Sequence, residues 1–268
     1  MLEGAEEDGT LFVSHYGGGK GVKEYQDILR EKLIDRYELT EGNFYSFYAS
    51  AKNGLEDTTR TRSFMFFSHA VVLASSVNHP VKLVIPENGL ISLNVPLTSS
   101  RLGSSSTRTT HPFYLSLFQR LLGNLKIIVN IWNPYQFKTK GEMIRECSGI
   151  EFLQKNIANT MSCSHPDLGR YARESEARHC GYCLPCVIRR SAIKNAGVQD
   201  ETRYRDLDFT SLDIAKMNYS SYMLGLTKFD SKLAFLDIQK AGPITQDLDR
   251  FSDLYIRGMK ELIALLED

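Results

Sequence analysis

The chain has 268 residues, of which 42% are hydrophobic, so it is long enough to bury a substantial core in one large domain or in two. Its 32 basic and 32 acidic residues cancel, which argues against a protein that binds nucleic acid mainly through bulk charge. No apolar run approaches the ~18–20 residues of a membrane-spanning helix, and the chain does not open on a secretory signal sequence. We therefore expect a cytoplasmic protein with no membrane partner.

The first half of the chain alternates between strand-like and helix-like segments. Short apolar runs bounded by turn residues predict strands at residues 11–14, 44–49, 81–85 and 126–131. Helical periodicity occupies the intervening segments at residues 22–37, 62–77, 112–122 and 139–147. This alternation predicts an α/β fold, a Rossmann-like parallel sheet flanked by helices, with ligands bound at the carboxyl ends of the strands.

A basic turn stands at the start of the helix predicted for residues 62–77. Arg60, Arg62 and Ser63 lie there, beside backbone amides that the first turn of a helix leaves without partners. Guanidinium groups at that position are suited to a phosphate or a carboxylate. The alternative is a solvated basic turn.

A second polar motif, Glu87-Asn88-Gly89, directly follows the strand predicted for residues 81–85. A carboxylate and an amide at the end of a strand can read the paired donors and acceptors of a purine-like edge. An ordinary turn would also explain the motif. It opens a long polar loop, predicted over residues 87–110, which contains Arg108 and leads to His111. Loops of this length are more often lids or binding segments than plain connectors, although His111 can equally be a simple loop histidine.

A third motif, Lys138-Thr139-Lys140-Gly141-Glu142, opens the helix predicted from residue 139. Thr139 and Glu142 have the spacing of a capping box, in which each side chain binds the backbone amide of the other residue. The box does not explain two lysines at a helix end that favours anions. A lysine at this position suits an anionic ligand such as pyrophosphate.

Four cysteines form the most specific motif: Cys163, followed by Cys180, Cys183 and Cys186 in a C-G-Y-C-L-P-C string. Four thiolates with C-x2-C spacing suit one tetrahedral zinc ion, and Gly181 permits the tight turn. Reduced structural cysteines, or disulfides in a secreted protein, are the alternatives. Because four sulfur ligands leave no open coordination position, the predicted zinc has a structural role.

The last third of the chain has helical periodicity and no convincing strand. Helices are predicted at residues 211–227, 228–240 and 248–266, and the last of these has an apolar stripe with a period of three to four residues. Such a stripe packs inside its own domain or binds a partner protein. We divide the chain into an α/β domain at residues 1–150, a zinc-binding element at 151–200 and a helical region at 201–268.

Taken together, these motifs resemble the PP-loop (N-type) ATP pyrophosphatase superfamily over about residues 10–190. The closest resemblance is to 7-cyano-7-deazaguanine synthase (QueC)-like proteins, especially the QatC-type branch of anti-phage defence systems. The cysteine string matches the end of the family's catalytic domain, Arg62-Ser63 resembles its Arg-Asn pair, and Asn133-Pro134 with Lys140 and Glu142 resembles its Pro-x5-Lys-x-Glu. Arg108 is similar to the arginine of its Asp-Cys-Arg.

The resemblance implies an adenine nucleotide alpha hydrolase-like fold, with ATP and Mg as cofactors and a deazapurine as substrate. It places Lys140 and Glu142 in catalysis, and gives Arg60, Arg62, Ser63, Glu87, Asn88, Gly89 and Arg108 to substrate or nucleotide binding. The family's phosphate loop, Ser-Gly-Gly-x-Asp-Ser, does not occur in the 268 residues, and the string Gly17-Gly18-Gly19 is interpreted as a turn. The segment at residues 11–14 is accordingly expected to be the family's second strand.

Three functions remain open at this point. The first is an ATP-dependent ligase that adenylates a deazaguanine carboxylate for attack by ammonia or by an amine of a partner protein. The second is a non-catalytic, zinc-stabilised subunit of a defence complex, which the absent phosphate loop favours. The third is a tRNA-modifying PP-loop enzyme, although nucleic acid is an unlikely direct substrate and Cys147 is the one cysteine outside the zinc motif.

Overall fold

The computed structural model describes residues 9–16, 20–49, 62–77, 79–97, 109–169 and 176–267, with the backbone alone for Lys20, Arg62 and Ser63. Its strands are β1 (Phe12–His15), β2 (Phe44–Phe47), β3 (Val81–Val84) and β4 (Val129–Trp132). Its α-helices are α1 (Lys20–Tyr37), α2 (Arg62–Ser75), α3 (Gly89–Leu93), α4 (Pro112–Asn124), α5 (Lys140–Arg145), α6 (Ile150–Asn156), α7 (Leu184–Asn195), α8 (Asp213–Thr227), α9 (Ala234–Gln239) and α10 (Leu248–Leu266). Short 3-10 helices are η2 (Glu41–Asn43), η4 (Ile157–Asn159) and η6 (Ser231–Leu233).

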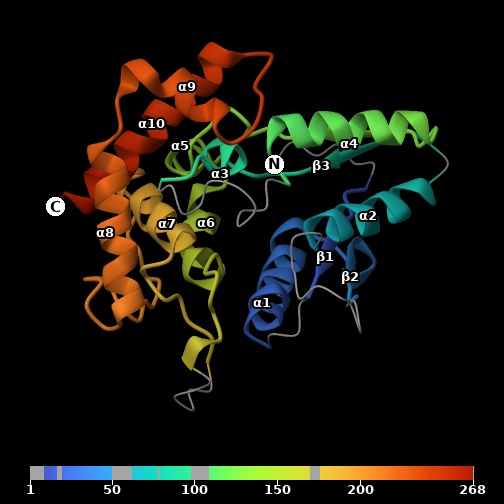
Figure 1. Ribbon diagram of the computed structural model, residues 1–268. Coiled ribbons are helices and arrows are strands. Elements are labelled where there is room, and N and C mark those ends of the chain that lie inside the picture. Colours follow the sequence, from blue (N-terminus) through green and yellow to red (C-terminus); the bar gives the residue numbers. More distant parts are fainter. Residues whose placement is uncertain are drawn as a thin grey trace, which may run out of the picture. The chain divides into compact units, whose positions relative to one another are not determined.

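The chain divides into two compact units, each built from two stretches of sequence. The first unit comprises Met1–Asp57 and Ile144–Asn218, and the second comprises Thr58–Met143 and Tyr219–Asp268. Each unit contains one pair of parallel strands (Figure 1). None of the described helices is long and apolar enough to cross a membrane.

In the first unit, β1 and β2 run parallel, and Phe12 lies opposite Phe44. The two rings stack with their centroids 4.7 Å apart, which pins the register at the start of the pair. A separate apolar core joins α5, α6, η4 and α7 through Ile144, Ile157, Ala192 and Ile193. This core supports the helix that follows the cysteine string.

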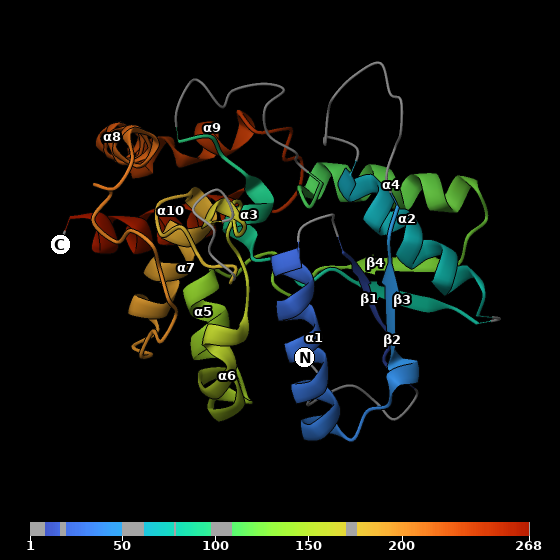
Figure 2. The same cartoon turned by 90° about the horizontal axis from the view of Figure 1, so that it is seen from below.

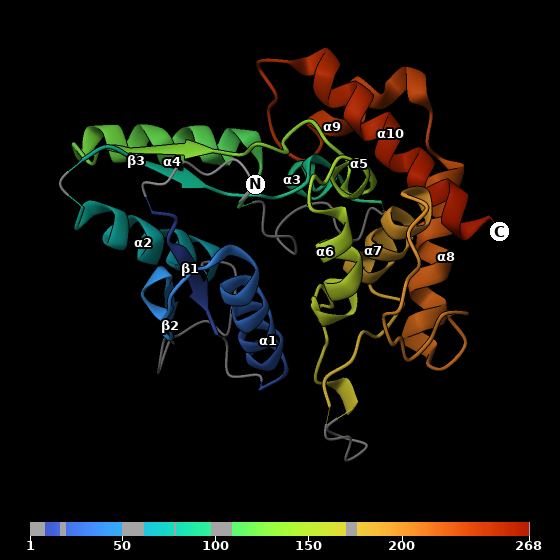
Figure 3. The same ribbon diagram turned by 180° about the vertical axis from the view of Figure 1, so that it is seen from behind.

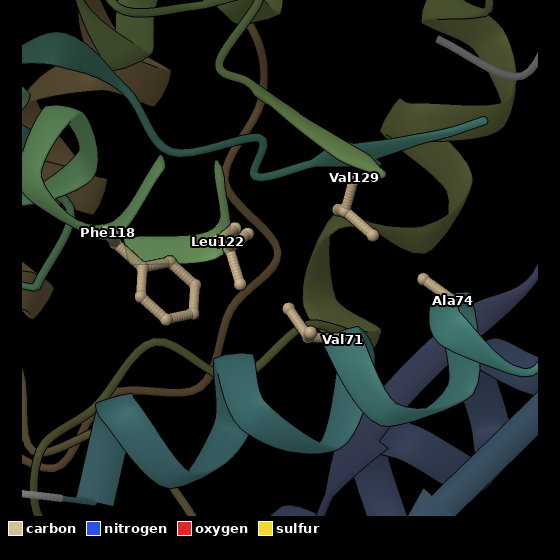
Figure 4. Close-up of a cluster of buried hydrophobic side chains, with 5 residues drawn as sticks. All are labelled: Val71, Ala74, Phe118, Leu122 and Val129. Carbon is tan, nitrogen blue, oxygen red and sulfur yellow. The ribbon is translucent and has the colours of Figure 1, made fainter. Parts of the chain in front are cut away.

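In the second unit, β3 and β4 run parallel, with Val81 opposite Val129. Figure 4 shows Val71 and Ala74 of α2 facing the side chains of Phe118 and Leu122 from α4 and of Val129 from β4. The side chain of Gln119 on α4 bonds the Val129 carbonyl at 2.9 Å and the Ile131 amide at 2.7 Å. These bonds satisfy backbone groups of β4 that could otherwise pair with another strand.

The apolar stripe of α10 is buried inside the second unit, as one of the two sequence alternatives required. Phe251, Leu254, Tyr255, Met259 and Leu262 are each at most 4% exposed. Figures 2 and 3 show α10 lying beside α9 and α3. Gly258 permits the close approach to α3, because a Cβ there would lie 2.7 Å from Leu90.

Three expectations about the fold need correction. One parallel sheet was expected, but the described strands form two separate pairs, since no described strand bonds to both. The segment at residues 87–110 is not entirely loop, because α3 forms at its start, where Asn88 accepts a bond from the Ile91 amide. The helix expected at residues 228–240 is instead η6 followed by α9, with Asp230 accepting a bond from the Lys232 amide at the start of η6.

Candidate metal centre and strand-end cleft

The four cysteines predicted as metal ligands converge in the first unit. All four Sγ atoms lie within 4.8 Å of one another, and all four residues are buried. Cys163 and Cys183 are 4.0 Å apart at sulfur, and Cys180 and Cys186 are 3.9 Å apart. An ion that binds four sulfurs at about 2.3 Å in a tetrahedron separates them by about 3.8 Å. The cluster therefore has the size and the donor set of a four-sulfur metal site.

The local backbone is arranged for thiolates. The amides of His165 and Cys180 each donate to the Cys163 sulfur at 3.3 Å, and the Cys183 amide donates to the Cys180 sulfur at 3.3 Å. Gly181 makes the turn with a φ of +92°, and a Cβ there would lie 1.9 Å from the Asp206 carbonyl oxygen. Only glycine fits this position without a shift of the backbone.

Disulfides do not form within this cluster. All five cysteines of the chain are free, and the sulfurs are far beyond bonding distance. The pKa of the Cys183 thiol is lowered because Cys163, and then Cys180 and Cys186, hydrogen bond to it. Cys147 is half-buried and lies outside the cluster.

Two arginines of α7 brace the segments around the cysteines. Arg189 is 3% exposed and donates to Thr160 Oγ1 at 2.6 Å and to Thr202 Oγ1 at 2.8 Å. Arg190 donates to the Gly181 carbonyl at 3.1 Å. Arg190 also interacts electrostatically with Cys186, and a positive group beside thiolates offsets their negative charge. Neither arginine was singled out from the sequence.

In the second unit, the motif after β3 is bonded largely to itself. Glu87 Oε1 accepts bonds from the Asn88 amide at 3.0 Å and from the Asn88 side chain at 2.8 Å, while Asn88 Oδ1 caps α3. Burial raises the pKa of the Glu87 carboxyl, and Lys140 and the bonds from Asn88 oppose that rise. At Gly89 a Cβ would lie 2.3 Å from both the Gln136 carbonyl and Leu254, so glycine is needed for packing.

The capping box at the start of α5 forms as predicted. The Thr139 amide donates to Glu142 Oε2 at 2.9 Å, and the Glu142 amide donates to Thr139 Oγ1 at 3.1 Å. The C-terminal helix α10 adds partners that the sequence did not indicate. Arg257 donates to Glu142 Oε1 at 2.6 Å, and the buried Glu261 accepts a bond from Thr139 Oγ1 at 2.5 Å.

These two residues of α10 were missed, although one signal for them existed. Glu261 lies seven residues after Leu254 and therefore falls on the apolar stripe of α10. A carboxylate on a buried face requires a donor in the core. The donor is Thr139, which is 0% exposed, so one buried hydrogen bond joins the apolar stripe of α10 to the capping box of α5.

The remaining predicted site residues are only partly described by the structure. Arg60, Arg108 and the Gly17-Gly18-Gly19 string lie outside the described residues. Arg62 and Ser63 open α2, as the sequence predicted, and their side chains are not described. His111 is 2% exposed, and its Nδ1 accepts a bond from the Phe113 amide at 3.2 Å, so it caps α4.

A cleft of about 320 Å³ opens at the carboxyl end of β4 in the second unit. One wall is formed by the first turns of α4 and by the end of β4 with the turn that follows it. The other wall is formed by the segment before α10 and by Phe251 within α10. Asn133 joins this cleft to the neighbouring strand end, because its side chain donates to the Glu87 carbonyl at 2.8 Å.

Comparison with known proteins gives partial matches to one kind of enzyme. The chain is 33% identical over 101 residues to the 7-cyano-7-deazaguanine synthase of Syntrophobacter fumaroxidans, covering 35% of this chain and 38% of the relative. It is 42% identical over 67 residues to the synthase of Cupriavidus taiwanensis, covering 25% of each. It is 37% identical over 73 residues to that of Myxococcus xanthus, covering 27% of each.

No family model and no solved structure matches the chain. The chain covers well under half the length of these curated relatives. Within that coverage the agreement is consistent, since all three are synthases of the same name, and the cysteine cluster suits a metal site. Parts of the chain are thus similar to 7-cyano-7-deazaguanine synthases, and the four cysteines form a possible metal site.

Proposed function

We propose that this chain belongs to an ATP-dependent ligase that activates the carboxylate of a 7-deazaguanine. The observation that carries the proposal is the similarity to three 7-cyano-7-deazaguanine synthases, at 33–42% identity over short spans. The converging cysteines support it, because the cysteine string, predicted from its spacing as a metal site, also resembles the end of the family's catalytic domain. A structural zinc ion would be held by Cys163, Cys180, Cys183 and Cys186.

The proposed reaction has two steps. A carboxylate oxygen of the deazaguanine bonds to the α-phosphorus of ATP, and the bond between the α- and β-phosphates breaks, so that pyrophosphate leaves. A nitrogen nucleophile then attacks the acyl carbon, and AMP departs. ATP bound with Mg supplies the leaving group and the activation.

The residues of the chain would serve this reaction as binding and positioning groups. Lys140, beside the Glu87 carboxyl, places a positive charge at the end of β3, where an anionic reactant needs it. Arg60, Arg62 and Arg108 are proposed to hold phosphate or carboxylate groups. Glu87 and Asn88 bind one another, so we assign them to shaping the strand end rather than to direct contact with the base.

The proposal also concerns the nitrogen nucleophile, and the choice of nucleophile determines the biological role. Ammonia would yield the primary amide, and a nitrile such as that of a 7-cyano product would require a second ATP to activate the amide oxygen, so that this oxygen leaves with AMP. In the anti-phage branch of the resemblance, the nucleophile would instead be an amine of a partner protein. Comparing pyrophosphate release and AMP release with ammonium and with a lysine-containing peptide separates these two acceptors.

A second candidate function is a metal-stabilised subunit that binds a deazapurine without catalysing its activation. The observation in its favour is that Thr139 and Glu142 of the proposed catalytic motif are bound to α10. Contacts of this kind give the motif a structural explanation that needs no reaction.

The test is release of pyrophosphate from ATP, measured with and without a 7-deazaguanine carboxylate. Release that depends on the carboxylate and is lost in Lys140→Ala, with Lys155→Ala of α6 as a matched control, supports the ligase. Calorimetric binding of the carboxylate without any release of pyrophosphate supports the second candidate instead. If the protein neither binds the carboxylate nor releases pyrophosphate, both candidates are wrong.

A further inference from the structure

The cleft at the end of β4 has the size of a small-molecule site. Its volume of about 320 Å³ lies at the lower end of the range for ligand pockets, which suits a compact ligand. It also lies at the carboxyl end of a parallel strand, the edge at which α/β proteins bind ligands. Residues 243–247, which lie outside the resemblance described above, form one of its walls.

The lining of the cleft combines flat apolar surfaces with neutral polar groups. Phe113 and Trp132 line it and are 40% and 44% exposed, and the Lys82 ammonium lies 4.7 Å from the centroid of the Trp132 ring. Amides and a hydroxyl are contributed by Gln136, Gln246 and Thr245. Open aromatic faces bind planar rings by stacking, while neutral polar groups provide orientation.

The charges of the cleft select against phosphates. Among the described residues, none of those that line it is a lysine or an arginine, and Asp247 is the one that carries a charge. A triphosphate would find no cation in the lining, and the Asp247 carboxylate, although it pairs with Arg250, would oppose its charge. The cleft is therefore suited to the uncharged ring of a ligand rather than to its phosphate groups.

Asp247 is placed in an unusual way. It occupies the N-cap position of α10, where an aspartate normally accepts a bond from the amides of the first turn, but its side chain makes no such bond. Its backbone has a φ of +53°, in the left-handed region that few residues other than glycine adopt. Asp247 is one of the residues that line the cleft, and its carboxylate pairs with Arg250 at 3.3 Å.

We propose that this cleft binds the ring of a guanine-type heterocycle, with Asp247 as the residue that determines specificity. A carboxylate has two acceptor oxygens, which match the ring N–H and the exocyclic amine that lie side by side on a guanine edge. An adenine edge presents an acceptor at the corresponding ring position and would be repelled. The choice of a deazaguanine rests on the proposed function, but the cleft and its edge preference do not depend on catalysis.

The experiment uses the only tryptophan of the chain, Trp132, as a probe inside the cleft. Titration with 7-deazaguanine should change the emission of Trp132, and titration with 7-deazaadenine should bind at least about tenfold more weakly. Asp247→Asn should remove that preference by weakening 7-deazaguanine about tenfold, because the amide offers one acceptor instead of two. Asparagine tolerates the left-handed backbone, so this variant should keep its fold.

The matched control is Asp249→Asn, which removes the same charge from the first turn of α10 but does not line the cleft. It should bind 7-deazaguanine like the unchanged protein. A second variant, Trp132→Leu, should weaken binding in calorimetry, which does not depend on the fluorophore. Equal binding of the guanine and adenine analogues, or equal weakening by both aspartate variants, would overturn the proposal.

The outcomes also separate this inference from the proposed function. If pyrophosphate release depends on a deazaguanine carboxylate but its KM is unchanged in Asp247→Asn, the ligase stands and the cleft is not its base site. If binding depends on Asp247 while no pyrophosphate is released, the cleft assignment stands and the ligase is wrong. If titration with 7-deazaguanine does not change the Trp132 emission of the unchanged protein, the cleft assignment is contradicted.

Discussion

The cysteine cluster and the strand-end motifs both contain buried polar groups, but these groups have different kinds of partner. In the cluster, the four sulfurs face one another, and nearby backbone amides point at them. At the strand ends, the motifs are bonded within themselves, as Asn88 is to Glu87, or to α10, as Glu142 is to Arg257. The cluster is arranged around an ion, whereas the strand-end motifs are arranged around one another and around α10.

This difference teaches how far a motif can be interpreted by itself. Ligands of one ion must converge on a single point, so the three cysteines of the C-x2-C string fix most of the geometry within seven residues. A capping box also forms locally, but its additional hydrogen-bond partners can be residues that are distant in the sequence. Thr139 meets Glu261, a residue 122 positions later. Variants of the two regions should therefore fail in different ways.

The largest effect is expected from loss of a cysteine ligand. Cys183→Ser should abolish tight metal binding, and because structural zinc supplies roughly 10 kcal/mol or more of apparent binding free energy, the first unit should lose its fold. Metal analysis of the purified protein and thermal unfolding with and without a chelator provide the measurements. Cys147→Ser is the matched control and should retain about one metal ion. Metal retained in a Cys180/Cys183 double serine variant would contradict the assignment.

The next effect concerns the turn that holds the cluster. Gly181→Ala should destabilise the protein by about 3 kcal/mol or more, because the new Cβ meets a backbone carbonyl in addition to a strained φ. Gly197→Ala is the matched control, since Gly197 also has a positive φ, of +68°, but a Cβ added there would meet no atom within 4 Å. That variant should cost only about 1 kcal/mol. Equal losses in urea unfolding would mean that the clash is relieved.

A smaller effect is expected at the strand ends. Arg257→Ala should lower the free energy of unfolding by about 1 kcal/mol, because the bonds to Glu142 are charged but Arg257 is 42% exposed to solvent. Lys260→Ala, an exposed cation on the same helix, should have almost no effect. Metal content should stay unchanged in both variants, which distinguishes this region from the cluster. Loss of metal in Arg257→Ala would remove the contrast between the two regions.

The smallest effect is a change in pH dependence at Glu87. Burial raises the pKa of this carboxyl above 4.5, so the folded state binds more protons than the unfolded state between the two pKa values. The free energy of unfolding should therefore fall as pH rises through that window. Glu87→Gln should remove this decline, with no difference from the unchanged protein well below pH 4.5 and a small gain at neutral pH. Thermal unfolding at several pH values checks the sign, and a loss of stability at neutral pH would contradict it.

The sequence predicted the elements whose causes lie within a few residues. The cysteine string, the box of Thr139 and Glu142, and the start of α2 at Arg62 all formed as expected. The alternation of strands and helices also held, because apolar periodicity and turn residues act locally.

Two of the three expectations that failed depended on distant partners. Helix α3 has only five residues and is too short to be stable alone, but Leu90 and Leu93 are buried and α10 covers them. The pairing of strands into separate sheets depends on which backbone edges meet, and hydrophobic pattern does not encode that choice. The wall of the cleft formed by residues 243–247 could not be foreseen, since only the fold brings this segment to the end of β4.

The bond between Thr139 and Glu261 has a consequence for synthesis on the ribosome. A chain emerges from its N-terminus, so Thr139 leaves the ribosome 122 residues before its partner does. Until α10 is made, Leu90 lacks its apolar cover and the buried hydroxyl of Thr139 lacks its acceptor. Contacts this distant in sequence are costly in loop entropy and form late. The second unit should therefore be completed only after Glu261 has emerged, whereas the cysteines of the first unit are all available once residue 186 has emerged.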